Sequence, residues 1–428
     1  MTQDWKSFNP VLIPNIPDLA KIDVYEKNGG YSALKKILVD EKWDSQSVIS
    51  EVKEANIRGR GGAGFNAGMK WSFMPEPDGG PRYLAANGDE SEPGTFKDRK
   101  IFEFNPHLFI EGCLIAAYAM KIDAVYVYIR GEYGEFIKMM DKAIDDAYQK
   151  GYLGKNILNT DFSVDMYTHS GAGAYICGEE TSLMESLEGK RGYPRVKPPF
   201  PAQKGLWGRP TTINNIETLA NVPHVINNGA SWFKSIGPDN HPGPVLYGIS
   251  GHVNRPGVYE FPSGMKITDL IYEACGGMRN NKGIKAIIPG GASTPPIRGD
   301  VIDGVTMDAD GLREVGTLMG TAGMLVMDED TDIVDVITRI SHFFDHESCG
   351  QCTPCRDGTG WLYKLMSRIN RGEGEMRDLD LLIDVCNKME GRTICALADA
   401  ACWPVRNAVE RFREDFEAKC KKTVYAVA

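Results

Sequence analysis

Apolar positions at strand spacing and at helical spacing alternate through the first half of the chain. Residues 31–56 follow the helical spacing, with Asp44 or Ser45 as the N-cap. The elements expected next are strands at 82–86, 124–129 and 162–168 and helices at 105–120, 132–149 and from 179 onward. Strands that alternate with helices in this way are typical of an α/β domain that binds a nucleotide.

The pattern changes twice in the second half of the chain. A helix is expected around 211–226, and a linker rich in proline and glycine at 237–244. A succession of strand, hairpin, helix and strand follows over 245–250, 257–261, 267–274 and 284–288, and it resembles a small β-grasp (ubiquitin-like) module. From Thr331 onward every segment has helical spacing.

These changes predict four parts. Residues 1–70 are expected to form an N-terminal helical segment that ends in a glycine-rich loop, and residues 71–240 an α/β domain. Residues 241–330 are expected to form the β-grasp module, and residues 331–428 a helical domain with a cysteine cluster. The predicted fold class is therefore α/β, joined to a β-grasp module and a C-terminal helical bundle.

The composition narrows the range of functions. There are 48 Lys and Arg against 58 Asp and Glu, a formal net charge of −10, which argues against nucleic acid or an anionic membrane as the main partner. The chain does not open with a basic segment followed by an apolar one, and the longest apolar stretch, 112–120, is far shorter than the ~20 residues that span a bilayer. We therefore expect a soluble, cytoplasmic protein without direct membrane insertion.

Three of the ten cysteines, Cys349, Cys352 and Cys355, lie in a single C-x₂-C-x₂-C turn. Such a turn supplies three of the four thiolates that a [4Fe–4S] cluster needs. A structural zinc site usually has two separated CxxC pairs, and the sequence has no second pair, so an iron–sulfur cluster is favoured over zinc.

The fourth thiolate must come from elsewhere in the chain. The candidates downstream are Cys386, Cys395, Cys402 and Cys420. We favour Cys395, because it lies in a short apolar loop before another expected helix, and we expect the remaining cysteines to be buried as small apolar side chains.

The segment Gly59–Gly64 matches the pattern G-x-G-x-x-G. A dinucleotide-binding fingerprint must follow a strand and open a helix, whereas here a helix is expected before the motif. The motif alone is therefore a weak sign of phosphate binding. Lys70 and Phe73, which follow closely, add a charge and an aromatic face.

Two acidic loops follow expected strands, at the position where open α/β sheets bind ligands. The first spans 87–94 and contains Asp89, Glu90 and Glu92, and the second is the pair Glu179-Glu180 after a second glycine loop. The first loop is a candidate cation site, a solvated turn, or a set of acceptors for ligand hydroxyl and amide groups. The sequence has no HExxH or GxSxG motif and no Walker A lysine, which argues against a zinc hydrolase.

Taken together, these motifs resemble those of the NADH-binding flavoprotein component (the F subunit) of bacterial NADH:quinone oxidoreductase, respiratory complex I. The resemblance spans nearly the whole chain. It is carried by 59–65 with 70–73, by 87–94, 171–180, 197–200 and 214–218, by 347–356, and by Cys395. Local departures from the family pattern are Asn66 and Cys402.

The resemblance implies a Rossmann-like domain of non-standard type that binds FMN and NADH at one site. The FMN-binding residues it implies are Gly59, Arg60, Gly61, Gly62, Gly64, Lys70, Asn87, Asp89, Glu90, Tyr175, Gly178, Glu179, Asn214, Asn215 and Thr218. The NADH-binding residues it implies are Phe65, Lys70, Phe73, Glu92, Glu180, Lys197 and Phe200. Cys349, Cys352, Cys355 and Cys395 would hold one [4Fe–4S] cluster.

The resemblance also implies an activity, in which FMN accepts a hydride from NADH and passes electrons singly to the cluster and on towards quinone. No side chain is expected to act as acid or base; Glu92 and Glu180 position the dinucleotide. Glu180 is expected to disfavour the 2′-phosphate of NADPH, with Lys197 offsetting it in part. The implied partners are a small thioredoxin-like iron–sulfur protein (the E subunit) and the peripheral arm of complex I, on the cytoplasmic side of the inner membrane.

Two alternatives stay open at this point. The diaphorase subunit of an NAD-linked hydrogenase or formate dehydrogenase shares these motifs. A ligand-binding scaffold protein is the alternative from a different class, because β-grasp modules also bind soluble ligands.

Overall fold

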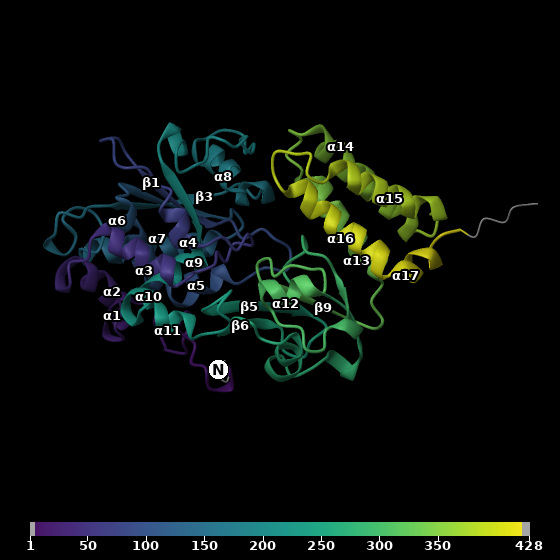
Figure 1. The fold of residues 1–428 in the computed structure, drawn as a ribbon, viewed down its shortest axis with the longest axis horizontal. Coiled ribbons are helices and arrows are strands. Elements are labelled where there is room, and N and C mark those ends of the chain that lie inside the picture. Colours follow the sequence, from purple (N-terminus) through teal and green to yellow (C-terminus); the bar gives the residue numbers. More distant parts are fainter. Residues whose placement is uncertain (1–4, 422–428) are drawn as a thin grey trace, which may run out of the picture.

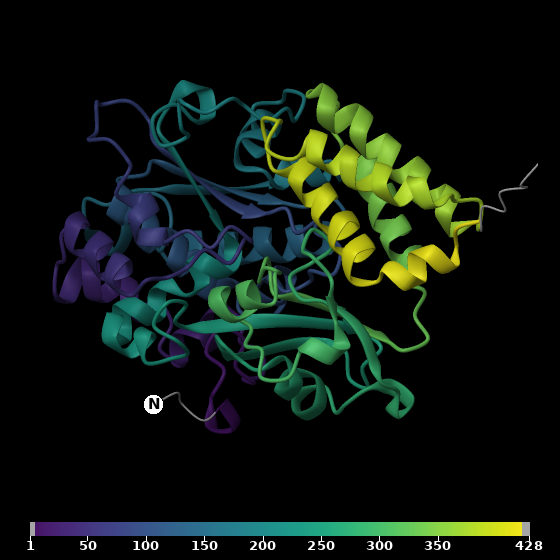
Figure 2. The same ribbon diagram turned by 45° about the vertical axis from the view of Figure 1, so that its right-hand side comes forward.

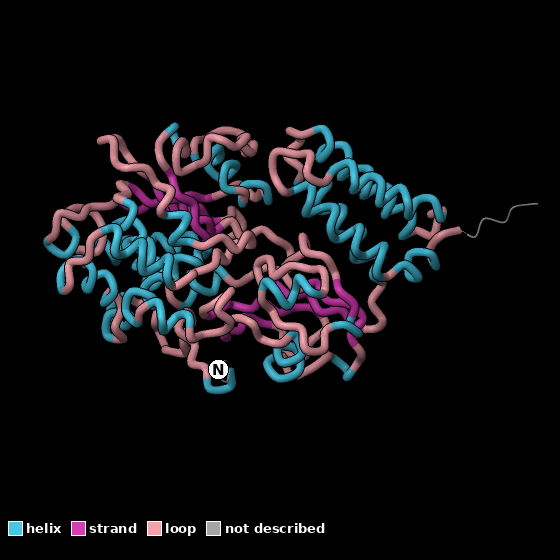
Figure 3. Tube along the Cα trace, viewed as in Figure 1, coloured by secondary structure: helices cyan, strands magenta, loops and turns pink. Residues whose placement is uncertain are grey.

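The computed structural model describes residues 5–421. A parallel α/β domain, a mixed β-sheet module and a C-terminal helical bundle lie against one another, with the bundle beside both other parts (Figures 1 and 2). Helices surround the parallel sheet, and long loops enclose the mixed sheet (Figure 3). Within the described residues no helix is long and apolar enough to cross a membrane.

The first part of the chain contributes short helices and then the parallel sheet. Its elements are α1 (Ile22–Lys27), α2 (Ser32–Lys35), α3 (Ser45–Glu54), α4 (Ala67–Trp71), β1 (Tyr83–Gly88), α5 (Asp98–Phe104), α6 (Pro106–Met120), β2 (Ala124–Ile129), α7 (Gly134–Gln149), β3 (Asp165–Ser170), α8 (Glu180–Leu187), β4 (Thr211–Asn215), α9 (Ile216–Ala220), α10 (Val222–Asn228) and α11 (Ala230–Lys234). The sheet order is β3-β2-β1-β4, and every pair is parallel.

Most of the helices and strands expected in this part are confirmed. Pro106 opens α6, and Asp44, an expected N-cap, caps α3 through Ser47 N. One expectation is wrong in part: residues 211–215 form the strand β4 instead of the start of a helix. Its Thr-Thr-Ile sequence is β-branched, and four of its five residues are buried beside β1. The expected helix over 31–56 is also interrupted, because Lys42 adopts a φ of +51°.

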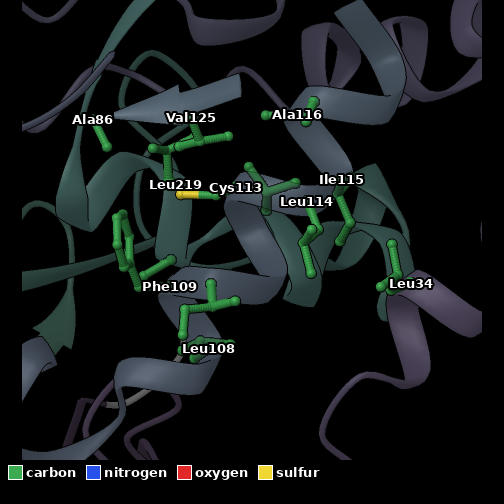
Figure 4. Packing of buried hydrophobic residues seen from close by; sticks show 14 of the residues in the cluster. Leu34, Ala86, Leu108, Phe109, Cys113, Leu114, Ile115, Ala116, Val125 and Leu219 are labelled. Carbon is green, nitrogen blue, oxygen red and sulfur yellow. The ribbon is translucent and has the colours of Figure 1, made fainter. Parts of the chain in front are cut away.

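The two faces of the parallel sheet belong to different cores. On one face Ala86 and Val125 pack with Phe109 and Cys113 of α6, which is buried along almost its whole length (Figure 4). Residues on the other face, among them Ala85, pack with α8. This second core continues into the C-terminal bundle, where it includes Phe344 and Leu397.

The mixed sheet has the order β6-β5-β9-β7-β8, with β5 parallel to β9 and its other pairs antiparallel. Its elements are β5 (Pro244–Gly251), β6 (Gly257–Pro262), β7 (Ile284–Ile288), β8 (Ile297–Arg298), α12 (Ala309–Glu314) and β9 (Gly323–Asp328), with a helical turn at Asp269–Ala274. The bundle that follows contains α13 (Ile333–Glu347), α14 (Thr353–Asn370), α15 (Met376–Met389), α16 (Leu397–Arg411) and α17 (Arg413–Ala418). The α/β class with a β-grasp-like module and a helical bundle is thereby confirmed.

Candidate flavin, nucleotide and cluster sites

The carboxyl ends of β1 and β4 meet at one edge of the parallel sheet, where Asn87 pairs in register with Asn215. From β1 the chain continues to β2 and β3 on one side of β1, and it then crosses back to β4 on the other side. The strand order therefore reverses between β1 and β4, and this position is the switch point of the sheet. Ligands of open α/β sheets bind outside the strand ends at such a point. Asn87 Nδ2 donates to the carbonyl of Gly178 at 2.8 Å, which holds the second glycine segment at the same edge.

The first glycine loop lies against this edge. The amide of Arg60 donates to Thr218 Oγ1 at 2.9 Å, and a Cβ atom on Gly61 would come within 3.2 Å of Asn215 Cβ. Gly62 has a φ of +109°, which residues with a side chain rarely adopt. The loop thus brings backbone groups that no side chain covers close to the switch point, as phosphate-binding loops do. The structure confirms that a helix, α3, precedes this loop.

The side chain of Arg60 points away from the loop. Its guanidinium is buried and donates to the carbonyls of Pro242 and Pro244 at 2.8 and 3.1 Å and contacts His241. Arg60 therefore fastens the glycine loop to the start of the β-grasp module, and only its backbone borders the switch point.

Asn214 and Asn215 are oriented by the elements around them. Trp71 Nε1, at the end of α4, donates to Asn214 Oδ1 at 2.9 Å. Asn215 Oδ1 accepts from Glu217 N at 3.0 Å and caps α9, while its Nδ2 donates to Asp98 Oδ2 at 2.6 Å. These contacts fix both amides at the strand end.

Asp89 supplies a direct test of whether a ligand fits this site. Both carboxylate oxygens are buried and have no hydrogen-bond partner among the described residues, and the neighbouring Ser91 Oγ also has none. Burial raises the pKa of Asp89 to about 7. A buried, unpartnered carboxylate is costly. A ligand that brings hydroxyl or amide donors, as the ribityl chain and ring of FMN do, would satisfy it.

Glu90 has a different role from its neighbour. Its carboxylate accepts from the amides of Lys97 and Asp98 at 2.7 Å each and from Tyr133 Oη at 3.1 Å. It therefore caps the start of α5 and is fully occupied by protein groups. Burial raises the pKa of Glu90 to about 7.

Glu92 connects the acidic loop to two other parts of the chain. Tyr175 Oη donates to Glu92 Oε2 at 2.7 Å, and Ser293 N, in the β-grasp module, donates to Oε1 at 2.6 Å. Burial raises the pKa of Glu92 despite these two donors. Ser293 is not among the residues predicted from the sequence. The feature that could have identified it is the glycine-rich run Gly290-Gly291-Ala292 directly before it.

Glu180 lies between two lysines. Lys70 Nζ donates to Oε2 at 2.9 Å and Lys197 Nζ donates to Oε1 at 2.5 Å. Burial acts to raise the pKa of Glu180, but the two ammonium groups outweigh it and hold that pKa below its ordinary value. Glu179 caps α8 through Thr181 N at 2.8 Å and lies 3.3 Å from Lys197.

Three aromatic side chains close to these loops remain open to solvent. Phe65, Phe73 and Phe200 are 47%, 56% and 53% exposed, and the rings of Phe65 and Phe73 are 6.0 Å apart between centroids. Exposed aromatic rings next to charged groups are suited to stack on a nucleotide base.

The four predicted cluster cysteines line a single small hollow. Cys349, Cys352, Cys355 and Cys395 surround it, and Ile176 and Pro194 form part of its wall. Burial raises the pKa of Cys355 to about 11 and that of Cys395 to about 12. Within residues 5–421 no three His, Cys, Asp or Glu side chains are gathered closely enough to hold a single metal ion, so the four thiols are spread around the hollow. Four cysteines in this arrangement fit an iron–sulfur cluster.

Cys402 lies outside this hollow. It is buried between α15 and α16, where its Sγ is 3.7 Å from the carbonyl of Cys386 and 3.9 Å from Met389 Sδ. Of the four candidates for the fourth ligand, Cys386, Cys395, Cys402 and Cys420, only Cys395 lines the hollow.

Three known protein families match separate regions of the chain. Residues 52–224 match the Nuo51 FMN-binding domain, residues 246–295 the SLBB domain, and residues 335–419 the NADH-ubiquinone oxidoreductase-F iron-sulfur binding region. Among solved structures, an NAD+-reducing [NiFe]-hydrogenase in the H2-reduced state is similar, with a TM-score of 0.82 and 34% identity over 89% of this chain. The match spans 63% of that hydrogenase chain.

Curated relatives resemble the chain over almost its full length. It is 51% identical over 413 residues to the second NADH-quinone oxidoreductase F subunit of Rhizobium meliloti (strain 1021), covering 96% of this chain and 97% of that protein. It is 49% identical over 400 residues to the NADH-quinone oxidoreductase F subunit of Rhodobacter capsulatus, covering 91% and 93%. The chain therefore belongs to the family of NADH-quinone oxidoreductase F subunits, with the FMN-binding and iron–sulfur-binding regions of that family.

Proposed function

We propose that this chain is the NADH-oxidising subunit of an NADH:quinone oxidoreductase, with FMN at the switch point of the parallel sheet and one [4Fe–4S] cluster in the C-terminal bundle. The observation that carries the proposal is that one segment serves both sites. Residues 175–178 border the switch point, and Ile176 forms part of the wall of the cysteine hollow.

When bound, FMN takes up electrons in pairs and releases them singly, which matches a nicotinamide donor to a one-electron iron–sulfur acceptor. The FMN would be held by the glycine loop and Lys70, by Asn87 and the unpartnered Asp89, by the segment 175–178, and by the strand end of β4. Glu90, Glu179 and Arg60 support this cradle through α5, α8 and the loop itself, as their hydrogen bonds indicate.

NADH would lie over the same edge. Phe65, Phe73 and Phe200 offer aromatic faces for the adenine, and Glu92, Glu180 and Lys197 offer polar contacts, with Lys70 between the two ligands. We assign no side chain as general acid or base, because the paired charges at Glu180 and the shared hydrogen bonds of Glu92 suit positioning.

Cys349, Cys352, Cys355 and Cys395 would ligate the cluster. We also propose the four-part division at residues 1–70, 71–240, 241–330 and 331–428. One buried cluster lies wholly within residues 245–326 and supports the β-grasp part. The other two clusters cross the proposed boundaries, because residues 12–71 share a core with the parallel sheet and the bundle shares one with both sheets.

We further propose that the chain binds a small thioredoxin-like iron–sulfur protein (the E subunit) within the peripheral arm of complex I, on the cytoplasmic side of the inner membrane, and that its cluster passes electrons on towards quinone. A groove of about 490 Å³ between α14 and α15 supports a docking site beside the cluster. It includes Thr353 and Pro354, which follow Cys352 directly, and the exposed Trp361.

The diaphorase of an NAD-linked hydrogenase is the second candidate, favoured by the likeness to the [NiFe]-hydrogenase. Purification of the chain with its partners would separate the two. The proposal expects one FMN and four iron per chain, flavin absorbance that bleaches on addition of NADH, and co-eluting iron–sulfur and quinone-reductase subunits. Co-elution of hydrogenase subunits would favour the diaphorase, and a purified chain without FMN would contradict both.

A further inference from the structure

Tyr175 stands where the α/β domain meets the helical bundle. Its ring packs edge-on against Phe343 and Phe344 of α13, with centroids 5.0 and 6.0 Å away. Its hydroxyl donates to Glu92, as described above, and its amide donates to Glu347 Oε2 at 2.9 Å. One residue of the flavin-side segment is thus held both by the acidic loop and by the bundle.

Glu347 is the last residue of α13 and lies two residues before Cys349. Its side chain is 16% exposed, and its second oxygen, Oε1, lies 3.2 Å from His346 Nδ1. The next residue, Ser348, contacts Cys355 Sγ through its hydroxyl at 3.3 Å. The chain around Glu347 therefore touches the flavin-side segment and the cysteine turn at once.

The other contacts between the α/β domain and the cysteine turn fix the distance between them less sharply. Ile176 and Pro194 form apolar walls of the hollow, and such packing does not fix a separation sharply. Arg191 reaches the carbonyl of Cys349 only at 3.4 Å, from an exposed position. The bond from Tyr175 N to Glu347 Oε2 is shorter, at 2.9 Å, and a hydrogen bond fixes both the distance and the direction between its two groups.

We infer that Glu347 is a positioning residue which sets the separation between the flavin-side segment 175–178 and the cysteine turn 349–355. The inference rests on the proposed function. Since electron transfer between two centres weakens steeply as they move apart, a bond that holds the two segments together controls the step from flavin to cluster. Glu347 contributes through its oxygen acceptor, so a neutral side chain with an oxygen in the same place retains most of the effect.

The test compares Glu347→Ala, Glu347→Gln and the control His346→Gln in the assembled, cofactor-loaded enzyme. The control removes the neighbour of Oε1 and leaves the bond to Tyr175. Hydrogen exchange of the Tyr175 amide reports the bond itself and needs no turnover. In Glu347→Ala the protection of this amide should fall about two- to tenfold, the range expected for the loss of one hydrogen bond.

The second readout is the rate at which NADH reduces the cluster, followed by electron paramagnetic resonance after rapid mixing. Glu347→Ala should slow this step about tenfold or more, because small misplacements of reacting groups cost rates of that order. Reduction of ferricyanide by NADH, with iron and FMN content, should stay at wild-type levels. Glu347→Gln should remain close to wild type in both readouts, and His346→Gln should equal it.

Three outcomes would overturn the inference: unchanged Tyr175 exchange in Glu347→Ala, unchanged cluster reduction in that variant, or an equal loss in Glu347→Gln and Glu347→Ala. The last would assign the effect to charge instead of position. Failure of the proposed function would look different, because the wild-type chain would then lack FMN or would not be bleached by NADH, whatever residue stood at 347.

Discussion

Lys70 and Lys197 each bind one carboxylate oxygen of Glu180, with nitrogen–oxygen distances of 2.9 and 2.5 Å. Lys70 is 110 residues away in sequence. The sequence motif around Glu180 offers only Lys197 as a residue that would partly offset its charge, and therefore predicts a stronger repulsion of the NADPH phosphate than the structure supports. The two lysines neutralise much of the carboxylate charge. How strongly Glu180 repels the 2′-phosphate of NADPH therefore depends on how far a bound dinucleotide draws the two lysines away from Glu180.

Glu180→Gln is accordingly expected to raise the ratio of kcat/KM for NADPH over NADH by about tenfold, because two ammonium groups then face the 2′-phosphate without a competing carboxylate. Glu180→Asp serves as the control that keeps the charge. Steady-state kinetics at low and high salt would measure the effect, which should be larger at low salt. A ratio that is equal in wild type and Glu180→Gln would show that another group selects the nucleotide.

Cys395→Ala should remove the cluster, whereas Cys402→Ala should keep iron near four per chain. The reason is their position, because Cys395 lines the hollow and Cys402 is packed against Cys386 and Met389. Iron analysis and the electron paramagnetic resonance spectrum of the reduced protein would compare the two. Retention of the cluster in Cys395→Ala with loss in Cys402→Ala would reverse the assignment.

Asp89→Asn should stabilise the FMN-depleted protein in a pH-dependent way. The folded pKa of about 7 lies above the unfolded value near 3.8, so the folded state holds a proton that the unfolded state has lost between these limits. The penalty of burying the ionised carboxylate is absent below about pH 4, grows as pH rises to about 7, and is constant above it. The gain in melting temperature of Asp89→Asn should follow the same course.

Bound FMN should abolish this advantage, because its donors would satisfy the wild-type carboxylate but find only an amide in the variant. Thermal unfolding from pH 4.5 to 8.5, with and without FMN, would show both effects. A stability difference that is independent of pH would mean that Asp89 is not the buried ionisable group described here.

Trp361→Glu should weaken binding of the iron–sulfur partner and leave NADH:ferricyanide activity intact. Trp361 is 56% exposed in the groove between α14 and α15, and a carboxylate there would oppose an apolar partner surface. Phe104→Glu is a matched control, since Phe104 is 46% exposed at the end of α5, outside the groove. Pull-down of the partner would measure binding, and equal loss in both variants would argue against the groove as the docking site.

Short-range patterns predicted much of this structure. The helix at 106–120, the strand at 124–129 and the cysteine turn were evident because spacing and turn chemistry are local properties. The strand at 211–215 was missed because its preference is decided by the partner strand β1, more than a hundred residues earlier. Local sequence likewise does not reveal that Glu90 caps α5 or that the side chain of Arg60 turns to Pro242 and Pro244.

The candidate site shows the same limit. The motifs predict which types of residue lie at the site, but not which contacts each residue makes there. Asp89 and Glu90 are adjacent and chemically alike, yet one carboxylate has no protein partner and the other has several. Ser293 and Glu347 come from two other parts of the chain, and their contacts with Glu92 and Tyr175 are evident only in the folded arrangement.

The apolar core shared by the parallel sheet and the bundle affects how the chain unfolds. Ala85 of β1, Leu183 of α8 and Phe344 of α13 belong to one buried cluster, so the bundle cannot leave without exposing a face of the sheet. Residues 5–330 alone would therefore expose a hydrophobic surface that invites aggregation. The mixed sheet contributes Ala286, Ile288 and Met327 to the same cluster, so heat or denaturant should melt both sheets and the bundle in one cooperative transition.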